Sequence, residues 1–139
     1  MIILGVDLGK ARTGVAVCDK SEMLASPVEV VREHNRERLL QRVAALAAER
    51  KAELIVMGLP RNMDGSEGES ALNARAFGEE LHTLCGLPVD FSDERGTTIT
   101  AHNFLNETNT RGKRRKETVD AVAATIILQN YLDFRRNKK

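Results

Sequence analysis

The chain has 139 residues, of which 42% are hydrophobic and 29% charged, and its formal net charge is +1. These proportions are typical of a water-soluble globular protein, and the length predicts one domain over residues 1–139. The apolar runs are too short to cross a bilayer, and we expect no secretion leader. Cys18 and Cys85 lie far apart without metal-ligand spacing, which argues against a disulfide scaffold and favours the reducing cytoplasm.

Charge is distributed unevenly along the chain. Residues 1–110 contain 12 basic and 17 acidic side chains, whereas residues 111–139 contain 9 basic and 3 acidic ones. A basic end on an acidic body predicts a polyanionic partner. Aromatic residues make up only 4% of the chain, so few side chains are available to stack on nucleic-acid bases. We therefore expect contacts mostly to phosphates.

The first part of the chain predicts three antiparallel strands. Residues 2–7 are an apolar, β-branched run, and residues 13–18 are a second run after a short, glycine-containing link. Residues 23–31 predict the third strand, and Pro27 places it at an edge of the sheet or at a bulge.

Helices and strands alternate after this point. Asn35 is the expected N-cap of a helix with apolar residues at helical spacing, and residues 54–58 predict a strand buried on both faces. A helix between two strands of one sheet implies a right-handed crossover and a parallel pair. The first and fifth strands are then expected to flank the fourth.

The second helix has recognisable ends. Ser66 and Glu69 fit a capping box at its start, and Gly86 is the expected end. This helix carries Leu72, Arg75, Ala76, Phe77 and Leu81.

The remainder predicts a fifth strand over residues 89–92 and a short helix that begins at Thr97 or Thr98. Residues 107–117 contain no apolar residue and predict a loop, and residues 118–134 predict a helix that packs on the sheet. The fold class is therefore α/β, with a mixed five-stranded sheet and helices on both faces.

Three carboxylates form the candidate site. Asp7 ends the first strand, Glu94 follows the fifth strand with Asp93 beside it, and Asp120 lies in the first turn of the last helix. Each alone has an ordinary explanation: a turn residue, a solvated partner of Arg95, and an acid that complements the helix dipole.

Convergence of these carboxylates would require a cation, because like charges repel one another. Mg²⁺ (or Mn²⁺) prefers oxygen ligands, and such ions can promote the attack of water on a phosphodiester. We therefore expect Asp7, Glu94 and Asp120 to be both catalytic and metal-binding. Asp93 is the alternative to Glu94, and Asp64 is either a fourth carboxylate or a turn residue.

Basic residues are expected to hold the nucleic acid. Glycines surround Arg12 and Thr13 in the first hairpin, but the order of residues is not that of a phosphate loop that opens a helix. The run before Asp120 is the main candidate for phosphate contacts. The expected contacts are Arg12, Thr13, Arg61, Arg95, Lys113, Arg114, Arg115 and Lys116.

Four segments in order resemble the YqgF-type family of pre-16S ribosomal RNA nucleases, which are relatives of Holliday-junction resolvases. They are Asp7–Ala16, Gly58–Gly65, Asp93–Arg95 and Val119–Ala124, the last with the basic stretch before it. The resemblance covers nearly the whole chain. It implies a ribonuclease-H-like fold, a cytoplasmic hydrolase that acts in ribosome biogenesis, and acidic site positions at Asp7, Glu94 and Asp120.

Two other functions remain open on sequence grounds. One is a nucleic-acid-binding module, for RNA or a DNA junction, with little or no cleavage. The other is a nucleotide-binding ATPase, because the hairpin after Asp7 also resembles the phosphate hairpin of actin-like enzymes. Those enzymes close a cleft between two domains, whereas this length predicts one. The oligomeric state, which we expect to be a monomer or a weak homodimer, does not follow from the sequence.

Overall fold

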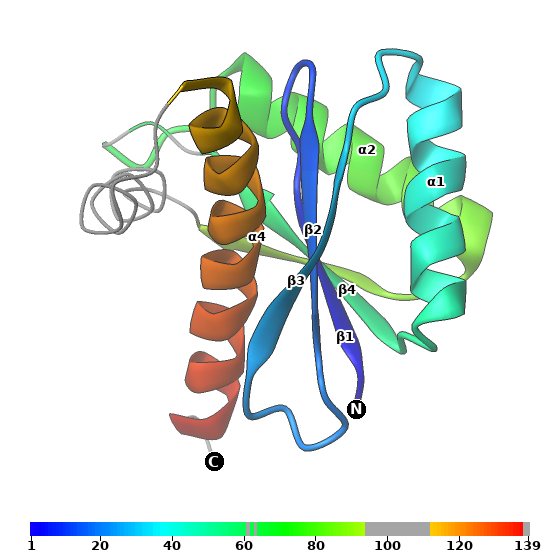
Figure 1. Cartoon of the computed structure of the whole chain (residues 1–139), viewed down its shortest axis with the longest axis vertical. Helices are drawn as coiled ribbons and strands as arrows, with labels where there is room; N and C mark the ends of the chain where they lie inside the picture. The colour runs from blue at the N-terminus through cyan, green and yellow to red at the C-terminus, as the bar shows by residue number, and fades with distance from the viewer. Residues whose placement is uncertain (61, 63, 94–111, 138–139) are drawn as a thin grey trace.

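The computed structural model of the chain describes residues 1–60, 62, 64–93 and 112–137, with the backbone alone described for residues 112–121. A mixed sheet lies between helices (Figure 1). The elements are β1 (Ile3–Asp7), β2 (Thr13–Cys18), β3 (Ala25–Val31), α1 (Arg36–Glu49), β4 (Leu54–Leu59), α2 (Glu69–Cys85), β5 (Val89–Asp93) and α4 (Gly112–Asn137). The predicted helix that begins at Thr97 or Thr98 falls outside the described residues.

The sheet has five strands in the order β3-β2-β1-β4-β5, as predicted. β1, β2 and β3 are antiparallel, whereas β4 is parallel to both β1 and β5. β3 is an edge strand, and its register against β2 shifts opposite Val15 and Ala16, next to Pro27. The parallel strands β1, β4 and β5 therefore end at the same edge of the sheet.

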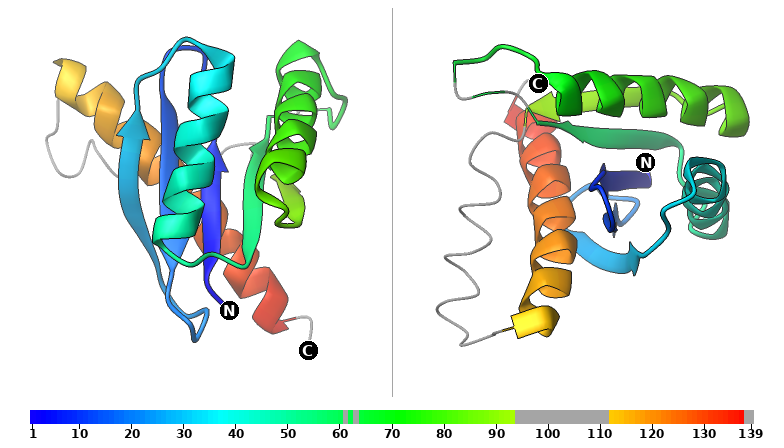
Figure 2. Two further views of the ribbon diagram at one scale, coloured as in Figure 1. Left: turned by 90° about the vertical axis from the view of Figure 1, so that its right-hand side faces the viewer. Right: turned by 90° about the horizontal axis from the view of Figure 1, so that it is seen from above.

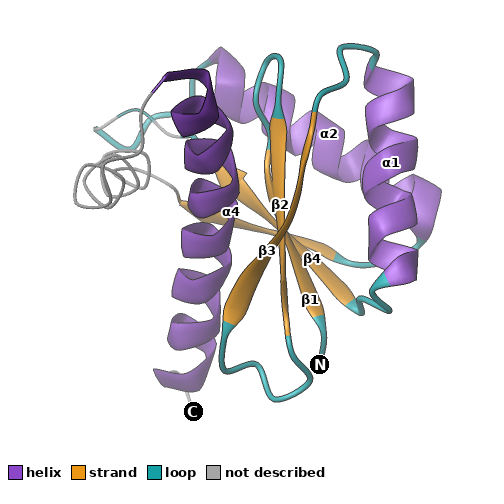
Figure 3. Ribbon diagram, viewed as in Figure 1, coloured by secondary structure: helices purple, strands orange, loops and turns teal. Residues whose placement is uncertain are grey.

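Helices cover both faces of the sheet (Figures 2 and 3). A hydrophobic core lies beneath the helices on each face. Helices α1 and α2 pack on one face against Leu4, Val6 and Ile55. Helix α4 packs on the other face, where Ala124 and Leu128 contact the sheet. Within the described residues no helix is long and apolar enough to span a membrane.

The helix ends confirm two predictions and correct one. The side chain of Asn35 accepts a hydrogen bond from the Arg38 amide, and Gly86 ends α2 in the left-handed region with φ 76°. The predicted capping box is wrong, because Gly68 is the N-cap of α2 and makes no side-chain cap bond. The hydroxyl of Ser66 instead donates to Asp64 at 2.6 Å, so it is not available to the helix.

Ala71, Ala74, Phe77 and Leu81 form the buried side of α2, whereas Leu72 is 60% exposed. Two further predictions need correction. The third strand begins at Ala25, since the amide group of Gln129 binds the backbone at Met23 and Ala25 and holds this turn against α4.

Residues 112–117, predicted as part of a loop, belong to α4. Lys, Arg and Glu are good helix formers, and extending an already packed helix adds one hydrogen bond for each residue ordered. The basic run therefore continues the helix that packs on the sheet.

Candidate active site

Asp7 lies at the end of β1 on the face that α4 covers. Side chains alternate along a strand, and Leu4 and Val6 point into the core beneath α1 and α2. Ile3, Gly5 and Asp7 therefore share the opposite face, where Ile3 packs in the α4 core. Asp7 is half-buried and pairs across β1 and β2 with Gly14, which has no side chain to cover it.

Helix α4 approaches β1 closely at Gly5. A Cβ atom at Gly5 would lie 2.9 Å from Cβ of Leu128 and 3.3 Å from the carbonyl oxygen of Ala124. The end of α4 lies beside the start of β1, since Arg135 and the amino group of Met1 both bind Glu22. The helix therefore runs back along the strand, and its N-terminal turns extend toward Asp7.

The spacing along the two elements brings residue 120 to the level of Asp7. One helical turn back from Ala124 leads to residue 120, which is a rise of about 6 Å for four residues. Two residues on from Gly5 lead to Asp7, which is about 6.7 Å along a strand. Both steps run in the same direction from the contact at Gly5. The side chain of Asp120 is outside the described part.

The register of β5 assigns its residues to the two faces. Phe91 pairs with Met57 and packs on α2, where a Cβ atom at Gly78 would lie 2.7 Å from its ring. Asp90 lies on the α4 side, because its carboxylate accepts a hydrogen bond from the Tyr131 hydroxyl at 2.7 Å. Asp93, opposite Leu59, follows the alternation of Phe91 and belongs to the α2 side. Glu94 falls outside the described residues.

The hairpin between β1 and β2 is tightly folded. A Cβ atom at Gly9 would lie only 2.2 Å from the carbonyl oxygen of Arg12, so glycine is required there. Thr13 is fully buried, and its hydroxyl has no hydrogen-bond partner in the described part of the molecule. A buried side chain offers no surface to a nucleic acid, so the burial of Thr13 argues against a direct contact in this conformation.

The loop between β4 and α2 gives Asp64 a structural role. The carboxylate of Asp64 accepts hydrogen bonds from the Ser66 amide at 2.9 Å and the Ser66 hydroxyl at 2.6 Å. Asn62 donates its side-chain amide to the same hydroxyl at 3.0 Å. This pattern is that of an aspartate that stabilises a turn. It favours the turn alternative for Asp64 over a fourth metal ligand.

Glu67 connects the same loop to α2 and β5. Its carboxylate binds Arg75 with two hydrogen bonds of 2.6 and 2.9 Å. The Arg75 guanidinium in turn lies 5.2 Å from the centre of the Phe91 ring. The hydrogen bond that Arg75 donates to Glu67 raises the pKa of the Arg75 guanidinium. This contact fixes the loop beside the edge where β4 and β5 end.

The oxygen chemistry of the site suits a divalent cation. Asp7 is a half-buried carboxylate at a strand end, and the face beside it is lined by glycines at positions 5 and 14. Hard cations such as Mg²⁺ prefer carboxylate oxygens. Residues with described side chains contain no group of three acidic, histidine or cysteine residues that could hold a metal. Two of the expected ligands, Glu94 and Asp120, are not among those side chains.

The structure describes only some of the basic residues that are expected to contact phosphates. Arg12 is half-buried in the hairpin and has an interaction partner. Arg61 and Arg95 fall outside the described residues. The backbone of residues 113–116 forms the first turns of α4, directly before Asp120.

The residues that position α4 were not predicted from the sequence. Gly5 allows the close approach of the helix, and a glycine inside a strand is a known signal of such an approach. Tyr131 connects α4 to β5 through Asp90, and partial burial together with this hydrogen bond raises the pKa of Tyr131.

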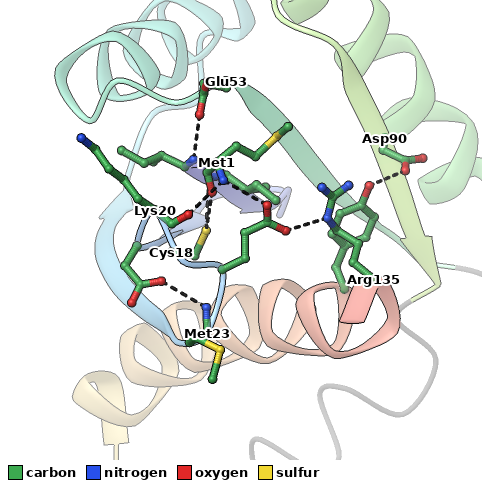
Figure 4. A network of polar contacts seen from close by, with 12 residues as sticks. Met1, Cys18, Lys20, Met23, Glu53, Asp90 and Arg135 are labelled. Atoms are coloured by element: carbon green, nitrogen blue, oxygen red, sulfur yellow. Dashed lines mark hydrogen bonds and ion pairs between the residues drawn. The ribbon is translucent and has the colours of Figure 1, made fainter. Parts of the chain in front are cut away.

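A second missed connection lies at the other end of α4. Arg135 donates to Glu22 at 2.8 Å, and the amino group of Met1 binds the same carboxylate at 3.0 Å (Figure 4). The Arg135 hydrogen bond holds the pKa of Glu22 below its usual range, against the opposing effect of partial burial. No short sequence pattern could have paired residues more than a hundred positions apart.

Known proteins resemble this chain over its whole length. A family model described as RuvX, Holliday junction resolvase, matches residues 1–134. A relative from Anaeromyxobacter sp. (strain Fw109-5), named as a pre-16S rRNA nuclease, is 47% identical over 135 residues, which cover 97% of this chain and 98% of the relative. A relative of the same name from Agathobacter rectalis is 42% identical over 142 residues, which cover 100% of this chain and 99% of the relative.

Among solved structures, Thermus thermophilus RuvC in complex with a Holliday junction substrate has a TM-score of 0.63 at 16% identity. The match covers 99% of this chain and 96% of that one. This likeness confirms the expected ribonuclease-H-like fold. Because the family model and the relatives match almost every residue, the chain belongs to the RuvX family of Holliday junction resolvases.

Proposed function

We propose that this protein is a metal-dependent endonuclease that hydrolyses phosphodiester bonds, with the 5′ end of pre-16S ribosomal RNA as its substrate. The observation that carries the proposal is the approach of α4 to β1, which directs residue 120 toward Asp7 at the edge where the parallel strands end. Ligands of open α/β sheets bind at this edge. The names of the full-length relatives support the choice of RNA.

Asp7, Glu94 and Asp120 are proposed to hold Mg²⁺ or Mn²⁺. The register of β5 supports Glu94 over Asp93, because Asp93 belongs to the α2 side of the sheet, away from Asp7. A bound divalent ion supplies Lewis acidity toward the scissile phosphate. The protein contributes a frame for the ligands, since the β1–β2 pairing holds the backbone of Asp7 and the backbone of residue 120 belongs to α4.

The first turns of α4 are proposed to bind the substrate backbone. A helix turns by about 100° per residue, so positions 113 and 116 lie on one side and positions 114 and 115 on others. One nucleic-acid strand therefore contacts only some of the four basic residues, which are Lys113, Arg114, Arg115 and Lys116. Arg12, Arg61 and Arg95 are proposed as further contacts, and Thr13 is left out because of its burial.

We expect the protein to act in the cytoplasm, as a monomer or a weak homodimer. A nucleic-acid-binding module without cleavage would use the same basic surface, so cleavage itself must be measured.

The test compares Asp7→Asn with wild type on RNA duplex, single-stranded RNA and a four-way DNA junction, each with Mg²⁺ and with chelator. We expect wild type to cleave RNA only with the metal, and Asp7→Asn to lose cleavage while its affinity for the same RNA stays nearly unchanged. Asp19→Asn, which makes the same charge change at the other end of the molecule, is the control. Near wild-type cleavage by Asp7→Asn would refute the proposed site, and preferred cleavage of the junction would replace RNA as the substrate.

A further inference from the structure

A groove runs along the outer surface between α1 and α2. Its volume is about 640 Å³, the size of a site for a small ligand or a few side chains of a partner. The floor includes Leu40 of α1 and Leu84 of α2, and Leu84 is 51% exposed. The other lining residues are Glu37, Gln41, Glu79, Glu80 and Thr83.

The rim of this groove is acidic. Glu80 binds Arg36 at 2.8 Å, so its charge is already compensated. Glu37 and Glu79 are exposed, and neither forms an ion pair with any residue in the described ranges. Among the side chains that the structure describes, none that lines the groove is basic. The groove therefore carries net negative charge around an apolar floor.

This combination argues against two occupants on physical grounds. A nucleic acid is a polyanion, and carboxylates without cations would repel it. A second copy that used the same face about a two-fold axis would bring Glu37 and Glu79 against acidic residues of the same kind. What complements the groove is a segment with both positive charge and an apolar stripe.

We propose that the α1–α2 groove is a docking site for a basic amphipathic segment of a partner protein. Leucine-like side chains of the partner cover Leu40 and Leu84, while its lysines or arginines face Glu37 and Glu79. Because α1 and α2 lie on the face of the sheet opposite α4, the partner and the nucleic acid bind without overlap (Figure 2). The inference does not depend on cleavage.

The test uses a fluorescent synthetic peptide of about 15 residues, with leucines every three or four positions and lysines elsewhere. Fluorescence anisotropy is recorded with the full-length protein, without metal or nucleic acid. We expect Glu37→Gln/Glu79→Gln to bind about five- to tenfold more weakly than wild type, the sum of two partly exposed charge pairs. Leu84→Ser should weaken binding as well. The control, Glu33→Gln/Glu49→Gln, removes the same charge outside the groove and should bind like wild type.

Several outcomes would overturn the proposal. Equal weakening by the control variant would mean that only the overall charge matters. Equal binding of a peptide with serines in place of leucines would remove the role of the apolar floor. Sedimentation equilibrium tests the remaining occupant: a wild-type dimer that Leu84→Ser dissociates would assign the groove to a second copy of this chain.

Discussion

The contact between β1 and α4 can be tested by placing one methyl group at Gly5. In Gly5→Ala the new carbon would lie 2.9 Å from Cβ of Leu128 and 3.5 Å from its Cδ2 atom, and 3.3 Å from the Ala124 carbonyl oxygen. Carbon atoms prefer separations of about 3.5–4.0 Å, so the helix has to move away from the strand. The carbonyl oxygen of Ala124 and the Cβ atom of Leu128 are fixed to the helix backbone, so a side-chain rotation cannot move them away.

The expected cost is that of overpacking a core, about 1–3 kcal/mol of the free energy of unfolding. For a domain of this size we expect the melting temperature to fall by roughly 4–12 °C. The displacement also moves the helix that carries Asp120 relative to Asp7. Cleavage per folded molecule should therefore fall at temperatures where Gly5→Ala is still fully folded, as measured by circular dichroism.

Gly78→Ala is the matched control on the other face. Its Cβ atom would lie 2.7 Å from the tip of the Phe91 ring and 3.2 Å from Cγ1 of Val89, both of which are side-chain atoms that can shift. Alanine also improves the helix by about 1 kcal/mol relative to glycine. We expect a smaller loss of stability and wild-type cleavage. If Gly5→Ala kept both wild-type stability and wild-type cleavage, the close packing of α4 on β1 would not position the site.

Three further predictions concern charge. Glu22→Gln should lower the free energy of unfolding at pH 7 by about 0.2–1 kcal/mol, because it weakens the bond to Arg135. The folded-state pKa of Glu22 is lowered, so its contribution is present above the unfolded pKa of about 4.3 and is lost as pH falls through the folded value. Thermal melts of the two proteins should then converge as pH falls below the folded-state pKa of Glu22, and a constant difference across pH would contradict the assignment. Alanine at all four basic positions of the first turns of α4 should reduce the salt slope of RNA binding, by about 0.7 for each lost contact on a single strand. Helical spacing predicts fewer than four lost contacts, and an unchanged slope in a filter-binding titration would remove this segment from the interface; the positions are Lys113, Arg114, Arg115 and Lys116. Millimolar Mg²⁺ should raise the melting temperature of wild type more than that of Asp7→Asn. If the three carboxylates converge as proposed, Asp7→Asn should melt at or above the wild-type temperature in chelator, because one of three like charges is then removed. A variant several degrees less stable in chelator would make Asp7 a structural turn residue.

Much of the fold could be predicted from the sequence, because strand and helix periods are local properties. Alternation and apolar runs predict the five strands, and the crossover rule predicts β1 and β5 on either side of β4. Three local signals act only through the backbone at that position or through the next few residues. They are Asn35 for a helix start, Gly86 for a helix end and Pro27 for an edge strand, and each could be predicted from the sequence. The same locality placed Asp7 at a strand end.

The tertiary structure decided which faces and which ends meet. The approach of α4 to Gly5, the bond between Tyr131 and Asp90, and the bond between Arg135 and Glu22 each join segments remote in sequence. Ser66 failed as a helix cap because Asp64 binds its hydroxyl, and the run at 112–117 became helical because a packed helix continues through it. The spacing of apolar residues along the chain predicts whether a segment is a helix or a strand. Which side chains become neighbours is determined only when elements remote in sequence pack together. That packing places Asp7 on the face of the sheet that α4 covers.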